Sequence, residues 1–145
     1  MRLHPFRALR PATGRASDVA SPPYDVIDTE EARALAADRP WSFLRVVRPE
    51  IDLEPGASIY GDEVYATGAA NLQRMQDDGV LVRDEEPAIW IYRLDMGERS
   101  QVGFVGCAEV EDYAQGRIKK HEFTRQEKED DRTRHVDTLG AHTGP

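Results

Sequence analysis

The sequence holds one cysteine, Cys107, and no long run of apolar residues. A single cysteine excludes an intrachain disulfide and fits a reducing cytoplasm. No stretch approaches the roughly 20 apolar residues that a membrane-spanning helix needs. Residues 1–12 carry basic side chains but lack the apolar segment of a secretory signal. We therefore expect a cytoplasmic protein that does not associate with membranes.

Signatures of several common enzyme classes are also missing. The chain has no glycine-rich phosphate loop of the Walker or dinucleotide-binding type, and no Gly-x-Ser-x-Gly elbow. Only 39% of the residues are hydrophobic, so a chain of 145 residues can form one domain with a thin core.

Charge is abundant but unevenly distributed. The formal net charge of -8 argues against non-specific binding to DNA or to an anionic membrane surface. Residues 1–116 contain twelve arginines and no lysine, with a balance of -9, whereas residues 117–135 have a balance of +2. A locally cationic segment on an acidic protein could bind a small anion. An ordinary charged helix from an arginine-rich proteome would give the same pattern.

The residue pattern predicts an α+β fold with a small mixed or antiparallel sheet, a central hairpin and two to three helices. The hairpin is expected between residues 88–92 and 102–107, where β-branched and aromatic residues flank a glycine-containing turn. The other expected elements are strands over residues 3–9, 41–47 and 80–82, a helix between Asp28 and Pro40, and helices over residues 59–78 and 125–139. We divide the chain into an N-terminal α+β region, residues 1–116, and a polar segment with a C-terminal helix, residues 117–145.

Two of the predicted helices carry capping-box spacing at their start, Asp28 with Glu31 and Thr124 with Glu127. The last helix, closed by Gly140, has almost no apolar stripe. Such a helix cannot dock by hydrophobic burial alone. It either lies on the surface, or lines a polar cleft, or packs on a part that this chain lacks.

The segment from Arg117 to Arg132 offers the most chemistry. Lys128 and Arg132 are four residues apart, so they share a helix face and could grip two phosphate oxygens. The same charges could equally form plain surface ion pairs. His121-Glu122 does not continue to a zinc-binding His-Glu-x-x-His, because the fifth position is Arg125. Zinc is therefore not expected, whereas Mg²⁺ needs only one or two carboxylates beside substrate phosphates.

A second candidate is the segment Ser21-Pro22-Pro23-Tyr24-Asp25. Each proline fixes its own backbone and keeps the residue before it extended, so Tyr24 and Asp25 could be presented rigidly. The alternative is a stiff loop with Tyr24 packed as a lid on the core.

Together these segments resemble a known bacterial family. Ser21-Pro22-Pro23-Tyr24-Asp25-Val26-Ile27, then Lys120-His121-Glu122-x-Thr124 and Lys128-Glu129-x-Asp131-Arg132, occur in the order and spacing of the family called domain of unknown function 1015. Members are mostly uncharacterised. They are distantly similar to the ParB and sulfiredoxin-like nucleotide-binding superfamily, which includes kinases acting on free serine.

The resemblance implies a small-molecule phosphotransferase, serine-kinase-like, that uses ATP or a diphosphate donor with Mg²⁺ and neither flavin nor nicotinamide. It implies catalytic roles for Asp25, His121 and Glu122, with Asp25 or Glu122 as the base. The residues expected to bind phosphate or substrate are Tyr24, Lys120, His121, Thr124, Lys128 and Arg132. The alternatives are a non-catalytic nucleotide- or partner-binding module, or an inactive fragment.

The resemblance also implies a longer protein. Family members carry an Asp-Gly-His-His-Arg motif further along, and this sequence has none. We therefore expect this chain to be an N-terminal portion, truncated before the rest of the family domain, with activity belonging to the full-length protein.

Overall fold

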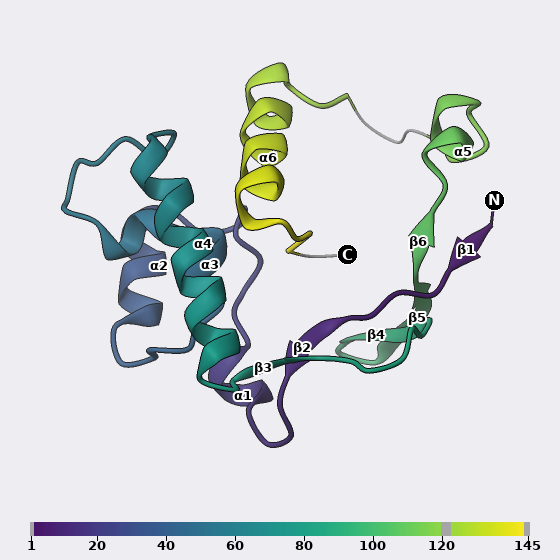
Figure 1. The fold of residues 1–145 in the computed structure, drawn as a ribbon, viewed down its shortest axis with the longest axis horizontal. Coiled ribbons are helices and arrows are strands. Elements are labelled where there is room, and N and C mark those ends of the chain that lie inside the picture. The colour runs from purple at the N-terminus through teal and green to yellow at the C-terminus, as the bar shows by residue number, and fades with distance from the viewer. Residues whose placement is uncertain (1, 120–122, 144–145) are drawn as a thin grey trace. The chain divides into compact units, whose positions relative to one another are not determined.

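A computed structural model describes residues 2–119 and 123–143. The described residues divide into two compact units, one of residues 11–82 with 125–143, and one of residues 2–10 with 83–119 and 123–124. The described residues form six α-helices, one 3-10 helix and six short strands (Figure 1). The predicted α+β class is confirmed, and no described helix combines the length and apolar composition that a membrane crossing requires.

The first unit is helical and is built on a small apolar core. Its elements are α1 (Ala16–Val19), α2 (Thr29–Ala36), α3 (Leu44–Val47), the 3-10 helix η1 (Pro49–Asp52), α4 (Asp62–Asp77) and α6 (Gln126–Leu139). Ala32 and Ala36 of α2 pack with Leu44, Val47 and Ile51. The predicted capping box starts α2, because the Asp28 carboxylate accepts from the Glu31 amide and the Glu31 carboxylate accepts from the Asp28 amide.

α4 buries one face in this unit. Its buried residues recur at helical spacing: Val64, Tyr65, Gly68, Leu72 and Met75. Gly68 allows close approach, since a Cβ there would lie 2.9 Å from Pro49 Cγ. The predicted helix over residues 59–78 therefore exists and is shorter by three residues at its start and one at its end.

Residues 41–47 do not form the predicted strand. Leu44–Val47 form α3 instead, and Leu44, Val46 and Val47 are all buried. Aromatic and β-branched residues favour strands, but a short apolar run buried on several sides can equally form a helical turn. Packing against α4 and η1 decides for the helix here.

The second unit contains the hairpin. β4 (Trp90–Met96) pairs antiparallel with β5 (Arg99–Val105), with Trp90 opposite Val105 and Tyr92 opposite Gly103, so the predicted hairpin is confirmed. β1 (Leu3–His4) pairs with β6 (Cys107–Ala108), and α5 (Val110–Ala114) follows. A third pair of strands, β2 (Leu9–Pro11) and β3 (Leu81–Arg83), lies where the chain passes from one unit to the other in sequence.

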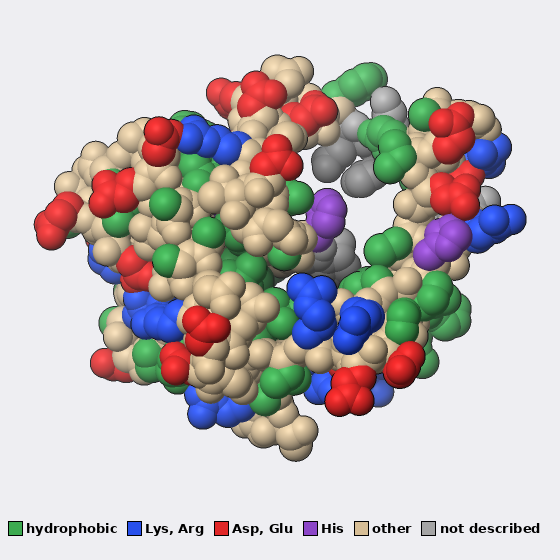
Figure 2. Space-filling model, in the orientation of Figure 1, with side chains coloured by type: hydrophobic (Ala, Val, Ile, Leu, Met, Phe, Trp, Pro, Cys, Tyr) green, Lys and Arg blue, Asp and Glu red, His purple; other side chains and the backbone are tan. Residues whose placement is uncertain are grey.

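α6 lies beside α4 (Figure 1). It begins one residue later than predicted and ends at Gly140, whose φ of 63° is left-handed as expected. The predicted capping box at its start is wrong. Arg125 occupies the N-cap position and makes no side-chain capping bond, so Thr124 lies outside the helix. Acidic side chains gather over its first turn (Figure 2), where they interact favourably with the positive end of the helix dipole.

Candidate functional site

The cations of α6 contact tyrosines rather than an apolar surface. The guanidinium of Arg132 lies 4.6 Å from the centre of the Tyr24 ring. The Lys128 ammonium donates to the Tyr60 hydroxyl at 3.2 Å and lies 5.8 Å from that ring centre. Cation–π contacts of this kind contribute about 0.5–2 kcal/mol each, depending on exposure. The helix that lacks an apolar stripe is thus docked through charged groups and aromatic faces.

Arg132 is held by Asp131 as well as by the Tyr24 ring. Its Nε and Nη2 donate to Asp131 Oδ2 at 3.0 and 2.8 Å, and the Tyr65 hydroxyl donates to Asp131 Oδ1 at 2.7 Å. We call Tyr24, Tyr65, Asp131 and Arg132 the Arg132 cluster. Burial, followed by the hydrogen bond to Asp131, raises the pKa of Tyr65 to about 12, so its phenol remains a donor at neutral pH.

The turn that carries Tyr24 is held in place by Arg48. Arg48 Nη1 donates to the carbonyls of Tyr24 and Ile27 at 3.0 and 3.1 Å. Arg48 Nε donates to Glu50 at 2.7 Å, and Nη2 donates to the Thr29 hydroxyl at 3.0 Å. Glu50 is buried, so its charge-assisted hydrogen bond with Arg48 is shielded from water. The proline-rich segment is therefore stiffened at its end by side-chain contacts as well as by its prolines.

Arg134 contacts the Arg132 cluster at the Tyr65 ring and is otherwise engaged outside it. Its guanidinium lies 4.4 Å from the centre of the Tyr65 ring and pairs with Asp62 at the start of α4. Both contacts join α6 to α4, so Arg134 acts as a structural cation.

His135 is the one described residue of α6 that is buried. Its Nε2 lies 3.0 Å from the Val46 carbonyl, which can only accept, so Nε2 carries a proton. Nδ1 is buried and has no partner among the described residues. Burial lowers the pKa of His135, and the positive charge of Arg132 acts in the same direction. The ring is accordingly neutral at pH 7.

The predicted site residues are only partly brought together. Tyr24 and Arg132 are in contact, and Lys128 lies on the same helix four residues away. Asp25 is exposed on the turn beside Tyr24, and its carboxylate has no hydrogen-bond or ion-pair partner among the described residues. Thr124 is exposed and belongs to the other unit. The predicted residues Lys120, His121 and Glu122 lie outside the described part of the chain.

Sequence reasoning missed several residues that hold this site. Tyr65 is 3% exposed and reads as an ordinary core residue of α4, and Arg48 follows a segment predicted as a strand. Asp131 stood in the family motif, but no role was predicted for it. Helical spacing could have placed Asp131 and His135 on one face of α6, since they are four residues apart.

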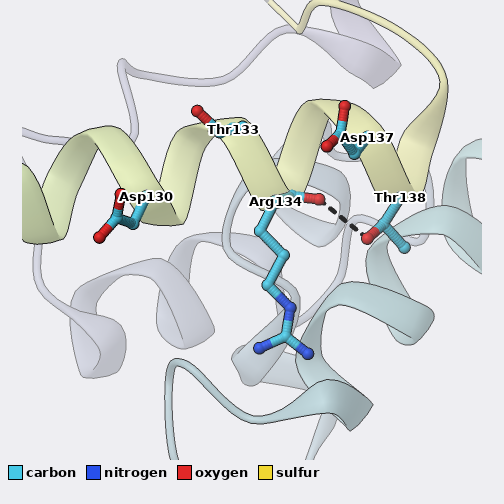
Figure 3. A pocket seen from close by; sticks show the side chains of 5 residues that line it. All are labelled: Asp130, Thr133, Arg134, Asp137 and Thr138. Carbon is cyan, nitrogen blue, oxygen red and sulfur yellow. Dashed lines mark hydrogen bonds between the residues drawn. The ribbon is translucent and has the colours of Figure 1, made fainter.

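A hollow of about 390 Å³ lies along α6 and is lined by Asp130, Thr133, Arg134, Asp137 and Thr138. Figure 3 shows Thr133 and Asp137 pointing to one side of the helix and Arg134 to the other, while the Thr138 hydroxyl donates to the Arg134 carbonyl at 2.8 Å. Since a single helix lines it and its one cation is already engaged, this hollow has no convergent polar groups for a ligand.

A second hollow, of about 340 Å³, belongs to the strand unit and is lined by Arg2, Glu109, Asp112 and Arg117. The Asp112 carboxylate accepts from Arg117 and from the Arg2 amide, and the Arg117 hydrogen bond holds its pKa below the usual range. These charges are mutually paired. Within the described residues, no three His, Cys, Asp or Glu side chains gather as a metal site.

A family model described as "Protein of unknown function (DUF1015)" matches residues 3–145. No curated protein and no solved structure matches the chain.

Proposed function

We propose that this chain, which belongs to the DUF1015 family, binds a phosphate group at its Arg132 cluster. The phosphate would be bound during phosphoryl transfer to a small hydroxyl substrate such as serine. The family description gives no activity, so the proposal depends on the chemistry of the site. The phosphate donor would be ATP or a diphosphate.

One observation carries the proposal. Arg132 stacks on Tyr24 and donates side-on to Asp131, yet its Nη1 has no partner among the described residues. A guanidinium held in this way presents its remaining N–H groups as a rigid fork, which matches two oxygens of a phosphate. Lys128, one helical turn earlier, supplies a second cation whose three N–H groups include two beyond the Tyr60 bond.

Phosphoryl transfer requires positioning and neutralisation of charge more than covalent chemistry by the protein. Arg132 and Lys128 would neutralise the donor's phosphates, while Arg48 keeps the Tyr24 turn in place. Asp25, an exposed carboxylate beside Tyr24, would accept the proton of the substrate hydroxyl. The roles predicted for His121, Glu122, Lys120 and Thr124 stay predictions.

A Mg²⁺ ion is compatible with these residues, because donor phosphates can supply most of its ligands. When bound, the ion would neutralise further charge on the donor. Asp131 is already engaged by Arg132 and Tyr65. Asp25, which is exposed beside Tyr24, would hold the ion instead. Asp25 can either hold the ion or accept the proton of the substrate hydroxyl. Asp25→Asn removes the charge that both roles need.

Calorimetric titration with ATP, diphosphate and inorganic phosphate tests the proposal. Arg132→Ala and Lys128→Ala should each weaken binding by about tenfold or more, which corresponds to the free energy of one charge-assisted hydrogen bond. Arg99→Ala, on the exposed hairpin, is the control that removes the same charge elsewhere. Equal heats for the wild type and all three variants would remove the proposal.

Turnover is measured separately, as phosphoserine formed from serine and the donor. Tight donor binding without product would instead favour the non-catalytic nucleotide-binding module.

A further inference from the structure

Among the described residues, one edge of the Arg132 guanidinium is engaged by a carboxylate. A guanidinium has a side-on edge, Nε with Nη2, and an end-on edge, Nη1 with Nη2. Asp131 Oδ2 takes the side-on edge through bonds of 3.0 and 2.8 Å. On the end-on edge, Nη1 has no partner among the described residues, and Nη2 has a second N–H group besides the one that donates to Asp131.

Asp131 is itself restrained. Its Oδ1 accepts from Tyr65 at 2.7 Å, and its side chain is only 11% exposed. Tyr65 belongs to α4 and is 3% exposed, so the chain of contacts from Tyr65 through Asp131 to Arg132 starts in the core of the helical unit. Tyr24 covers one face of the same guanidinium and limits its rotation.

We propose that Tyr65 and Asp131 are positioning residues, which fix Arg132 so that its end-on edge receives two oxygens of a terminal phosphoryl group. The inference rests on the proposed function and adds the geometry of recognition to it. A long arginine side chain that is already ordered loses little further rotamer freedom when the anion binds.

Asp131→Ala gives a test in which two explanations differ in sign. Removing a carboxylate beside an anion site should tighten phosphate binding if only charge matters. If Asp131 positions Arg132, phosphate binding should instead weaken by about three- to tenfold, the usual effect of freeing one long side chain. Tighter or unchanged binding by Asp131→Ala overturns the proposal.

Tyr65→Phe tests the same chain of contacts without changing any charge. It removes one hydroxyl and keeps the ring that faces Arg134. We expect phosphate affinity to fall by about threefold or more. Inorganic phosphate is the probe, and Tyr92→Phe on β4, whose side chain is exposed, is the matched control.

Two NMR measurements separate positioning from damage to the fold. The Nε–H group of Arg132 should become more mobile in both variants, while the amides of α6 keep their hydrogen-exchange protection. If Tyr65→Phe lowers the protection of α6 as a whole, the phosphate affinity of Asp131→Ala decides whether Arg132 is positioned by this chain of contacts. A normal affinity in both variants together with a loss in Arg132→Ala would reject the positioning role and leave the proposed function standing. An unchanged Arg132→Ala would reject the proposed function first.

Discussion

Acidification should destabilise this protein through His135. The ring is 2% exposed and holds its proton on Nε2, which donates to the Val46 carbonyl. Burial lowers the pKa of His135 in the folded state, whereas the unfolded chain has the ordinary value of about 6.5. Below that pH the unfolded chain binds more protons than the folded one, so the free energy of unfolding falls as pH falls. The loss continues down to the lowered pKa of the folded state.

The change in the free energy of unfolding is limited because one group, His135, binds one proton. A single group whose charge differs between the two states changes the free energy of unfolding by at most about 1.4 kcal/mol per pH unit. The nearby charges act in opposite directions, since Arg132 lowers the pKa of His135 and Asp131 raises it. Burial is the largest cause, so the direction is determined by the position of the ring inside the protein.

Urea denaturation between pH 5 and 8 measures the effect. His135→Gln is the informative variant, because the glutamine amide can still donate to the Val46 carbonyl but does not titrate. The variant should show a flatter dependence on pH than the wild type, and the exposed His142→Gln should behave as the wild type does. Parallel pH profiles for the wild type and His135→Gln would refute the reasoning.

Three further variants test how the helices are built, each by urea denaturation. Gly68→Ala should destabilise by about 1–3 kcal/mol, because its Cβ would lie 2.9 Å from Pro49 Cγ, and a more stable variant would mean that this approach is looser than described. Asp28→Ala should cost about 1 kcal/mol by removing the cap of α2, with Asp38→Ala, outside any helix cap, as its control. Gly140→Ala should cost about 1 kcal/mol through its left-handed φ of 63°, and Gly140→Asn should cost less; equal losses would contradict the conformational explanation.

Local signals were enough to predict much of the fold. The capping box of Asp28 and Glu31 forms as its spacing indicates, and Gly140 ends α6 in the expected conformation. The hairpin has the predicted pairing because alternating β-branched and aromatic residues meet across a short turn. These features depend on residues close together in the sequence.

The errors come from contacts between distant segments. Residues 41–47 have strand propensity, but packing with α4 and η1 makes Leu44–Val47 helical. Thr124 and Glu127 have the spacing of a cap, but the helix starts after Arg125. A spacing rule states only that a cap is possible, and the path of the chain before the helix determines whether it forms.

The candidate site shows the same limit. Lys128 and Arg132 share a helix face, as their spacing required. Their partners Tyr60 and Tyr24 come from residues about seventy and about a hundred positions away. Cation–π contacts leave no periodic pattern in a sequence. The role of Tyr65 likewise depends on one hydrogen bond across two helices.

The polar attachment of α6 gives this helix its own thermodynamics. Its release would expose less apolar surface than global unfolding, because His135 is its one buried side chain among the described residues and its contacts with the tyrosines are made by charged groups. The urea m-value and the heat-capacity change both scale with newly exposed surface. Detachment of α6 should therefore depend weakly on urea and on temperature while global unfolding depends strongly on both. Solutes that compete for cations or for aromatic faces, such as guanidinium at low concentration, would shift that local equilibrium first.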